Sequence, residues 1–378
     1  MNNLLNLINY GQSYWLDNLT RGKINSGELK RRITDEGLFG ITTNPSIFNN
    51  AISNSKDYNN QMIELFNQKK QVYEVYEELA IKDVQDACDI MRPVFDKSDG
   101  VDGFVSLEVS PHLAHDTEGT INEARRLHKK LNRKNCFIKI PATDEGIPAI
   151  EEMLYDGINI NVTLLFSIRG YEAVAEAYLK ALERRVAEGK SIKDIRSVAS
   201  FFLSRIDVLV DRLLSQLPFQ EEKHGELPYP KDLFGKAAIA NAKLAYQAFG
   251  RIFIGERWNA LKRKGAHVQR PLWASTGTKN PNYSDVKYVE PLIGQNTVNT
   301  LPDETIAAFA NHGVAVKDTI LNDINGAEKV LLDLNKLGVD INDVGQQLLN
   351  EGIKKFEEAY DMLLSNINAN REKIIGEK

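Results

Sequence analysis

The feature that most constrains the fold is a repeated alternation of short apolar runs with stretches of helical periodicity. Eight such runs occur along the 378 residues, and each ends on a polar or charged cluster. Runs that are apolar throughout are typical of strands buried on both faces, as in parallel sheets covered by helices. In chain order the runs are SYWLDN, LFGITTN, GFVSLEVS, CFIKIPAT, INVTLLFS, SVASFFLSR, RPLWASTGTK and NTVNTLPD.

The stretches between most of these runs have the three- and four-residue spacing of an amphipathic helix. Ile121, Ala124 and Leu127 follow this spacing in residues 120–132, and residues 171–188 form a second example. Alternating strands and helices indicate the α/β class, with parallel strands joined by crossover helices. A doubly wound open sheet would also alternate, but no glycine-rich dinucleotide fingerprint or P-loop follows any run. We therefore predict a single (β/α)8 TIM-type barrel.

Two longer stretches interrupt the alternation. One covers about residues 206–268, with a polar segment over 218–231 and then the Ala-rich segment LFGKAAIANAKLAYQAFGRIF, which we predict to be a helix. The other is a helical tail over about 320–378, which either covers the mouth of the barrel or packs only on its outside. No repeat or Pro-rich linker divides the chain, so residues 1–378 are expected to form one barrel domain with extra helical insertions.

Composition excludes several classes of protein. The formal net charge is −5 and basic residues are interleaved with acidic ones, so we expect no nucleic-acid partner. No run of about 18 apolar residues suggests a membrane span. Cys88 and Cys136 are the two cysteines and lack the spacing of a zinc site or disulfide framework, which favours a reducing, cytoplasmic location.

In barrels of this type the active site lies at the carboxyl ends of the strands. The polar ends of the runs therefore supply the candidate residues, which comprise one amine, two carboxylates, amides, hydroxyls and a guanidinium. They are Asp17, Asn44, Glu108, Lys139, Asn161, Thr163, Ser200, Arg205 and Ser275.

Lys139 is the most informative of these residues. It lies between Ile138 and Ile140 in a run that otherwise reads as a buried strand. Burial disfavours a charged ammonium and favours the neutral amine, which is the form that attacks a carbonyl group. The iminium formed in that attack withdraws electrons and allows cleavage of a neighbouring carbon–carbon bond. The alternative is a structural lysine that reaches solvent at a strand end or pairs with a carboxylate.

Seven motifs together resemble the transaldolase family, in the family's order, from about residue 11 to residue 312. The resemblance implies a barrel of the class I aldolase type with a leading helix, and no metal or other cofactor. The motifs are WLDN, GITTNPSIF, SLEVSPHLAHDT, IKIPAT, NVTLLFS, SFFLSRID and WASTGTKNP.

The resemblance implies four catalytic residues. Lys139 matches the lysine that forms a Schiff base with the substrate, and Asp17 matches the general acid/base. Glu108 and Thr163 match a pair that holds a catalytic water beside the lysine. Taken alone, Asp17 would be read as a helix cap or turn residue, and Glu108 as a buried ion-pair partner, which is compatible with pairing to Lys139.

The resemblance also implies the substrate-binding residues. Asn44, Asn161 and Ser200 fit groups that orient the hydroxyls of a dihydroxyacetone unit, although each alone would more often be a turn or strand-end residue.

Arg205 and Ser275 match positions that bind the substrate phosphate. The chain departs from the family's better-known branch after Ser275, because an arginine is replaced by the sequence TGTK. We interpret Lys279 as the substitute cation, aided by backbone N–H groups near Gly277. A solvent-facing loop lysine is the alternative.

His112, His115 and Asp116 resemble a metal cluster by composition, but we predict a loop or helix-start role for them and no metal site.

The function implied is that of a transaldolase, a transferase that moves a dihydroxyacetone unit between sugar phosphates in the non-oxidative pentose phosphate pathway. Sugar phosphates are the expected partners, and a homodimer is possible. A fructose 6-phosphate aldolase is one alternative, although Glu108 and Phe202 favour the transferase, since the aldolases that resemble this family tend to carry Gln and Tyr there. A non-catalytic sugar-phosphate-binding barrel is the other alternative.

Overall fold

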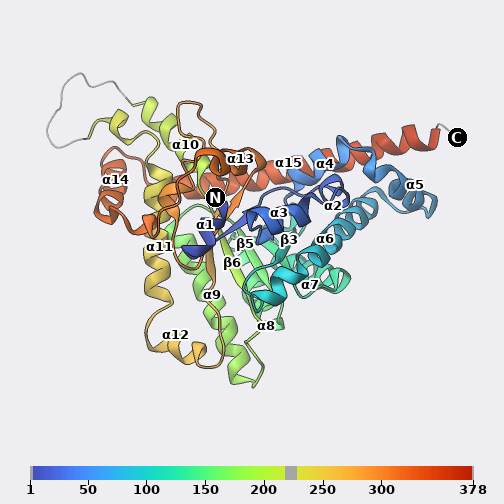
Figure 1. The fold of residues 1–378 in the computed structure, drawn as a ribbon, viewed down its shortest axis with the longest axis horizontal. Coiled ribbons are helices and arrows are strands. Elements are labelled where there is room, and N and C mark those ends of the chain that lie inside the picture. The colour runs from blue at the N-terminus through green and yellow to red at the C-terminus, as the bar shows by residue number, and fades with distance from the viewer. Residues whose placement is uncertain (1–2, 218–227, 377–378) are drawn as a thin grey trace.

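The computed structural model of the chain describes residues 3–217 and 228–376, and it contains a closed barrel of eight parallel strands in sequential order (Figure 1). Every strand pairs with its neighbours in the sequence, and β8 returns to pair with β1. The eight predicted apolar runs each contain one strand, so the predicted (β/α)8 barrel is confirmed. The strands are β1 (Gln12–Leu16), β2 (Gly40–Ile41), β3 (Phe104–Glu108), β4 (Cys136–Pro141), β5 (Ile160–Leu165), β6 (Ser197–Phe202), β7 (Arg270–Ala274) and β8 (Thr297–Leu301).

Helices surround the barrel and lie between its strands in sequence. The leading helix α1 precedes β1, as the family resemblance implies, and the predicted helices over 120–132 and 171–188 correspond to α7 and α9. The helices up to β6 are α1 (Asn3–Asn9), α2 (Arg21–Asn25), α3 (Glu28–Glu36), α4 (Pro45–Ser53), α5 (Asn59–Asn67), α6 (Val72–Lys97), α7 (Thr117–Leu131), α8 (Gly146–Asp156) and α9 (Ile168–Ala187), with 3-10 helices η1 (Lys56–Tyr58) and η2 (Pro111–Leu113).

The interruption between β6 and β7 is helical, as predicted. It contains α10 (Ser204–Ser215), η3 (Pro230–Leu233), α11 (Ala237–Ile252) and α12 (Gly255–Lys262), and α11 is the Ala-rich helix. Residues 218–227 of the polar segment lie outside the described residues. The connection from β7 to β8 departs from the regular pattern, because it holds only the 3-10 helix η4 (Glu290–Leu292). Its residues 280–285, NPNYSD, are rich in turn formers, which disfavour a helix.

The tail after β8 forms α13 (Asp303–His312), η5 (Thr319–Leu321), α14 (Ile324–Lys336) and the long helix α15 (Ile341–Gly376). Helix α15 contacts α4 and α10, which follow β2 and β6, and it also contacts β5. Since β2 and β6 lie on opposite sides of an eight-stranded ring, α15 crosses the carboxyl end of the barrel. Figure 1 shows it continuing past α4 and α5 to the C-terminus.

A buried polar cluster joins the amino ends of β1, β7 and β8 to Asp102, which lies just before β3. Arg270, the first residue of β7, donates to Asp102 Oδ1 at 2.9 Å, to Ser13 Oγ at 2.6 Å and to the carbonyl oxygen of Thr297 at 2.8 Å. Ser13 Oγ and Trp15 Nε1, both on β1, donate to the same Asp102 carboxylate. Because Arg270 and Asp102 are both buried, each charge depends on the other for compensation.

No helix within the described ranges combines the length and apolar character that crossing a bilayer requires.

We expect Asp102→Ala to lower the free energy of unfolding by about 3–5 kcal/mol, because it leaves the buried Arg270 guanidinium without its carboxylate. Urea denaturation measures this change. The matched control is Asp96→Ala, which breaks the exposed pair between Arg92 and Asp96 and should cost less than about 1 kcal/mol. Equal losses for the two variants would contradict a stabilising role for the buried cluster.

Candidate active site

A cavity of about 210 Å³ lies at the carboxyl end of the barrel and brings together residues from β1, β2, β4, β5, β6, β7 and β8 or from the loops that follow them. Of the ten residues predicted for the site, eight line this cavity. Glu108 and Asn161 lie directly behind it and contact lining residues. The eight are Asp17, Asn44, Lys139, Thr163, Ser200, Arg205, Ser275 and Lys279.

Lys139 and Glu108 form a buried ion pair. The register between β3 and β4 places the two residues opposite each other, and Lys139 Nζ lies 3.1 Å from Glu108 Oε2 and 3.0 Å from the carbonyl oxygen of Thr43. Each of the two charged side chains is only 6% exposed. Burial raises the pKa of Glu108 above its ordinary range, although the nearby Lys139 cation opposes the shift. The amine therefore has a proton-exchange partner within hydrogen-bond distance.

Asp17 follows β1 and lines the same cavity. In the ring of strands, β1 lies across the barrel from β4 and β5, which carry Lys139 and Thr163. Thr42 Oγ1 donates to Asp17 Oδ1 at 2.8 Å, and the Thr42 hydroxyl also lies 2.6 Å from that of Thr300. Desolvation raises the pKa of Asp17, while the hydrogen bond from Thr42 and the charge of Lys139 act in the opposite direction. A carboxyl group with a raised pKa is suited to gain and lose a proton near neutral pH.

Asn161 and Ser200 form a hydrogen-bonded pair within the barrel wall. Ser200 Oγ donates to Asn161 Oδ1 at 2.7 Å, and Asn161 Nδ2 donates to Ser106 Oγ at 3.0 Å. Asn161 is fully buried and adjoins Lys139 in the register of β4 and β5. The structure thus places Ser200 at the cavity surface and Asn161 beneath it, where the amide orients the serine hydroxyl.

Thr163 and Asn44 complete the wall near the lysine. The Thr163 hydroxyl is buried and has no hydrogen-bond partner among the described residues, which suits a group that binds a water or a substrate hydroxyl. Asn44 caps α4, since its Oδ1 accepts from the backbone N–H of Ile47 at 3.0 Å. The cap leaves the Asn44 Nδ2 donor for the cavity, so its structural role and its predicted binding role are compatible.

Two cationic side chains besides Lys139 line the cavity. Arg205 is in the first turn of α10, its guanidinium carbon lies 5.3 Å from the centre of the Phe202 ring, and its buried Nη1 has no partner among the described residues. Burial lowers the pKa of Arg205. Ser275 has a left-handed backbone, with a φ of 54°, and its hydroxyl lies 2.9 Å from that of Ser204 at the start of α10. Lys279 lines the exposed rim. The start of α10, the Arg205 guanidinium and the Lys279 ammonium group all favour the binding of an anion.

The cavity is also lined by seven residues to which the sequence analysis gave no role: Thr42, Ala274, Thr276, Thr300, Pro302, Glu304 and Phe356. Thr42 is the partner of Asp17, Glu304 lies at the rim, and Phe356 comes from α15. The position of Thr42 just after β2 is a signal that could have identified it. Phe356 carries no such signal, because an apolar residue on an amphipathic helix is usually part of the core.

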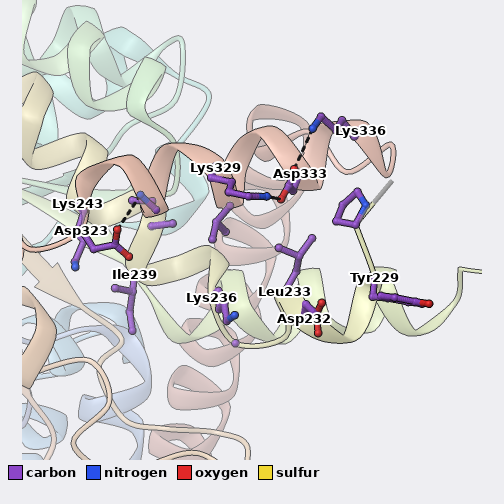
Figure 2. A pocket seen from close by; sticks show the side chains of 16 residues that line it. Tyr229, Asp232, Leu233, Lys236, Ile239, Lys243, Asp323, Lys329, Asp333 and Lys336 are labelled. Atoms are coloured by element: carbon purple, nitrogen blue, oxygen red, sulfur yellow. Dashed lines mark hydrogen bonds and ion pairs between the residues drawn. The ribbon is translucent and has the colours of Figure 1, made fainter. Parts of the chain in front are cut away.

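A larger cavity, of about 690 Å³, lies elsewhere, between η3, α11 and α14 (Figure 2). Its lysines are largely compensated: Lys329 and Lys336 both pair with Asp333, and Lys243 donates to the carbonyl oxygen of Asn322. None of the predicted site residues lines it.

The histidine-containing motif after β3 has structural roles, as predicted. Asp116 caps α7 by accepting from the backbone N–H of Gly119, while His112 pairs with Asp361 of α15 and His115 with Glu145. Within residues 3–217 and 228–376 no cluster of three or more His, Cys, Asp or Glu side chains has the arrangement of a metal site.

The geometry suits covalent chemistry on the carbonyl group of an anionic substrate. The cavity presents one buried amine as a nucleophile, the Asp17 carboxyl group as a proton carrier, and the Arg205 and Lys279 cations in its lining. Glu108 adjoins the amine from behind.

Comparison with known proteins agrees with this chemistry. Residues 14–367 match the family described as Transaldolase/Fructose-6-phosphate aldolase. The chain is 47% identical over 373 residues to Transaldolase 2 of Nostoc sp., with 97% of each chain covered. It is 46% identical to a transaldolase of Trichodesmium erythraeum, covering 99% of this chain and 98% of the relative, and 44% identical to one of Mycobacterium bovis, covering 97% and 96%. The chain therefore belongs to the transaldolase/fructose-6-phosphate aldolase family.

Proposed function

We propose that this protein is a transaldolase, which transfers a dihydroxyacetone unit from a ketose phosphate to an aldose phosphate through a Schiff base on Lys139. The observation that carries the proposal is the position of the Lys139 amine, which is 6% exposed at the cavity and 3.1 Å from a carboxylate. Near full-length relatives named transaldolase support the same reaction.

In the first half of the reaction, the Lys139 amine adds to C2 of the ketose phosphate and water leaves as the iminium forms. Glu108 and Thr163 assist by exchanging protons through a water beside the lysine, which the unpartnered Thr163 hydroxyl is placed to bind. Asp17 then removes the proton of the C4 hydroxyl, the C3–C4 bond breaks, and its electrons pass to the iminium as an enamine. An aldose phosphate leaves.

In the second half, the bound enamine attacks the aldehyde carbon of a second aldose phosphate. Asp17 returns its proton to the new C4 hydroxyl, and water releases the product ketose phosphate from Lys139. Sedoheptulose 7-phosphate with glyceraldehyde 3-phosphate, giving erythrose 4-phosphate and fructose 6-phosphate, is the expected pair of substrates. This reaction belongs to the non-oxidative pentose phosphate pathway.

The anionic end of the substrate is assigned to Arg205, Ser275 and Lys279. A guanidinium holds two phosphate oxygens at fixed geometry, and the Arg205 Nη1 donor is free of other partners among the described residues. Asn44 and Ser200 are assigned to the hydroxyls of the three-carbon unit, with Asn161 holding Ser200 in place.

A fructose 6-phosphate aldolase is the second candidate within the same family. It shares the Schiff base but releases free dihydroxyacetone. Glu108 and Phe202 support the transferase instead, because the Phe202 ring places no hydroxyl beside the intermediate.

We also propose that the whole chain acts as one domain, since the C-terminal helix α15 contacts α4, α5 and α6 from the first third of the chain. A cytoplasmic location fits the two buried free thiols. The proposal includes no nucleic-acid or membrane partner.

The proposal includes assembly as a homodimer. Analytical ultracentrifugation would test it.

Borohydride reduction in the presence of fructose 6-phosphate should attach a dihydroxyacetone-derived mass to Lys139, because reduction converts the iminium to a stable amine. Digestion and mass spectrometry locate the adduct. Lys139→Met is the control and should take up no label. A wild-type protein that is not labelled, under conditions that label a known transaldolase, would refute the Schiff base.

Asp17→Asn should lower kcat by about 100- to 10,000-fold, since the amide cannot remove the C4 proton. The Schiff base can still form, so borohydride should trap the six-carbon ketose phosphate on Lys139 in place of the three-carbon unit. Asp96→Asn, on an exposed helix, is the matched control. A three-carbon adduct formed at the wild-type rate would exclude Asp17 as the base.

The same substitution should stabilise the fold at neutral pH. Because burial raises the folded-state pKa of Asp17 above 3.8, the folded protein loses stability as the pH rises from below 3.8 through the raised value. Asn at this position avoids that loss, so the free energy of unfolding at pH 7 should increase by about 0.5–2 kcal/mol. Urea denaturation below pH 3.8 should show a smaller difference in the free energy of unfolding between Asp17→Asn and the wild type. The same increase in stability at both pH values would contradict this explanation.

Lys279→Ala should raise KM for erythrose 4-phosphate by up to about fivefold, the range expected for an exposed ion pair. KM for unphosphorylated erythrose should be unchanged, and Lys279→Arg should restore the wild-type value. Lys236→Ala, in the wall of the larger cavity, is the control. An equal effect on both erythroses would show that Lys279 does not bind the phosphate.

A further inference from the structure

The residue of α15 that enters the active-site cavity is Phe356. Its side chain is 4% exposed, and the centre of its ring lies 5.6 Å from Lys139 Nζ and 5.8 Å from Arg205 Cζ. One apolar ring thus lies beside both the proposed nucleophile and the proposed phosphate-binding group. It is supplied by a segment more than 200 residues beyond Lys139 in the sequence.

Two glycines allow α15 to approach the barrel closely enough for this contact. A Cβ atom at Gly352, one turn before Phe356, would lie 2.9 Å from Leu164 Cδ2 and 3.4 Å from Arg205 Nη1. A Cβ atom at Gly345, a further two turns back, would lie 3.1 Å from Ser167 Cβ. The three residues share one face of the helix, so the seating of α15 on the ends of β5 and β6 determines where Phe356 lies.

The ring forms part of an apolar lining that has no proton to donate. Arg205 Cζ lies 5.3 Å from the centre of the Phe202 ring as well as 5.8 Å from that of Phe356, so two aromatic rings flank the guanidinium. Phe202 in turn contacts Phe166, with ring centres 5.2 Å apart. The rings of Phe202 and Phe356 thus add apolar surface to a cavity that Lys139, Asp17 and Thr163 also line.

We propose that Phe356 is a specificity-determining residue, which favours transfer of the three-carbon unit over its release by keeping water, other than the one assigned to Glu108 and Thr163, away from the Lys139-bound intermediate. Release without an acceptor needs a proton on the enamine carbon, then addition of water at C2 of the iminium. The carbon–nitrogen bond then breaks, giving free dihydroxyacetone and the lysine amine. Transfer needs no water until the new carbon–carbon bond has formed. This inference rests on the proposed transaldolase activity.

The test is to measure two rates for Phe356→Ala with fructose 6-phosphate as the donor: release of free dihydroxyacetone without an acceptor, and transfer to glyceraldehyde 3-phosphate. The ratio of release to transfer should rise by about 2- to 30-fold, because removal of the ring lets water reach the intermediate and hydrolyse it. Phe356→Leu keeps an apolar side chain of smaller size and should give an intermediate ratio.

Leu363→Ala is the matched control, because Leu363 is fully buried on the same helix but does not line the cavity. It should lower thermal stability and leave the ratio at the wild-type value. If Phe356→Ala does not fold, as judged by circular dichroism, the two rates are measured for Phe356→Leu instead. A ratio of release to transfer that is at least about twofold above the wild-type ratio then supports the proposal.

Release and transfer that fall together in Phe356→Ala or Phe356→Leu, with an unchanged ratio, would overturn the inference and assign Phe356 a packing role only. That result leaves the transaldolase proposal intact, since the wild-type protein would still transfer. A wild-type protein that forms no Lys139 adduct and transfers nothing would instead overturn the proposed function, and this inference with it.

Discussion

The pairing of β8 with β1 is the interaction on which the rest of this structure depends. It leaves the sheet without an edge and forces the carboxyl ends of eight strands into one ring. Residues as distant in sequence as Asp17 and Ser275 then border a single cavity. The buried Arg270–Asp102 ion pair lies at the opposite end of the barrel. The amino ends of the strands therefore contribute to stability, and the carboxyl ends carry the residues of the cavity.

Several charged groups in and behind the cavity are buried, and burial destabilises their charged forms. Asp17 and Glu108 both have pKa values raised by burial, and the Arg205 guanidinium has its pKa lowered for the same reason. Each of these groups would be more stable in water. The fold maintains them because the surrounding strands, whose residues are almost all buried, are stable enough to hold a destabilised site.

Helix α15 adds a residue from the C-terminal tail to the cavity. Lys139 lines the cavity at the carboxyl end of the barrel. By crossing that end, α15 places Phe356 beside the lysine, and the glycines at 345 and 352 make the approach sterically feasible. The tail therefore has a role in the cavity that its amphipathic pattern does not reveal.

The sequence by itself determined the eight strands, the parallel barrel and eight of the residues that line the cavity, because strand burial and polar strand ends are local patterns. Tertiary structure alone decided that Asn161 supports Ser200 from behind, that Thr42 is the partner of Asp17, and that Phe356 reaches Lys139. These contacts depend on strand register and on the seating of a distant helix. Neither is encoded in the residues near Lys139, since the packing of the whole chain sets both.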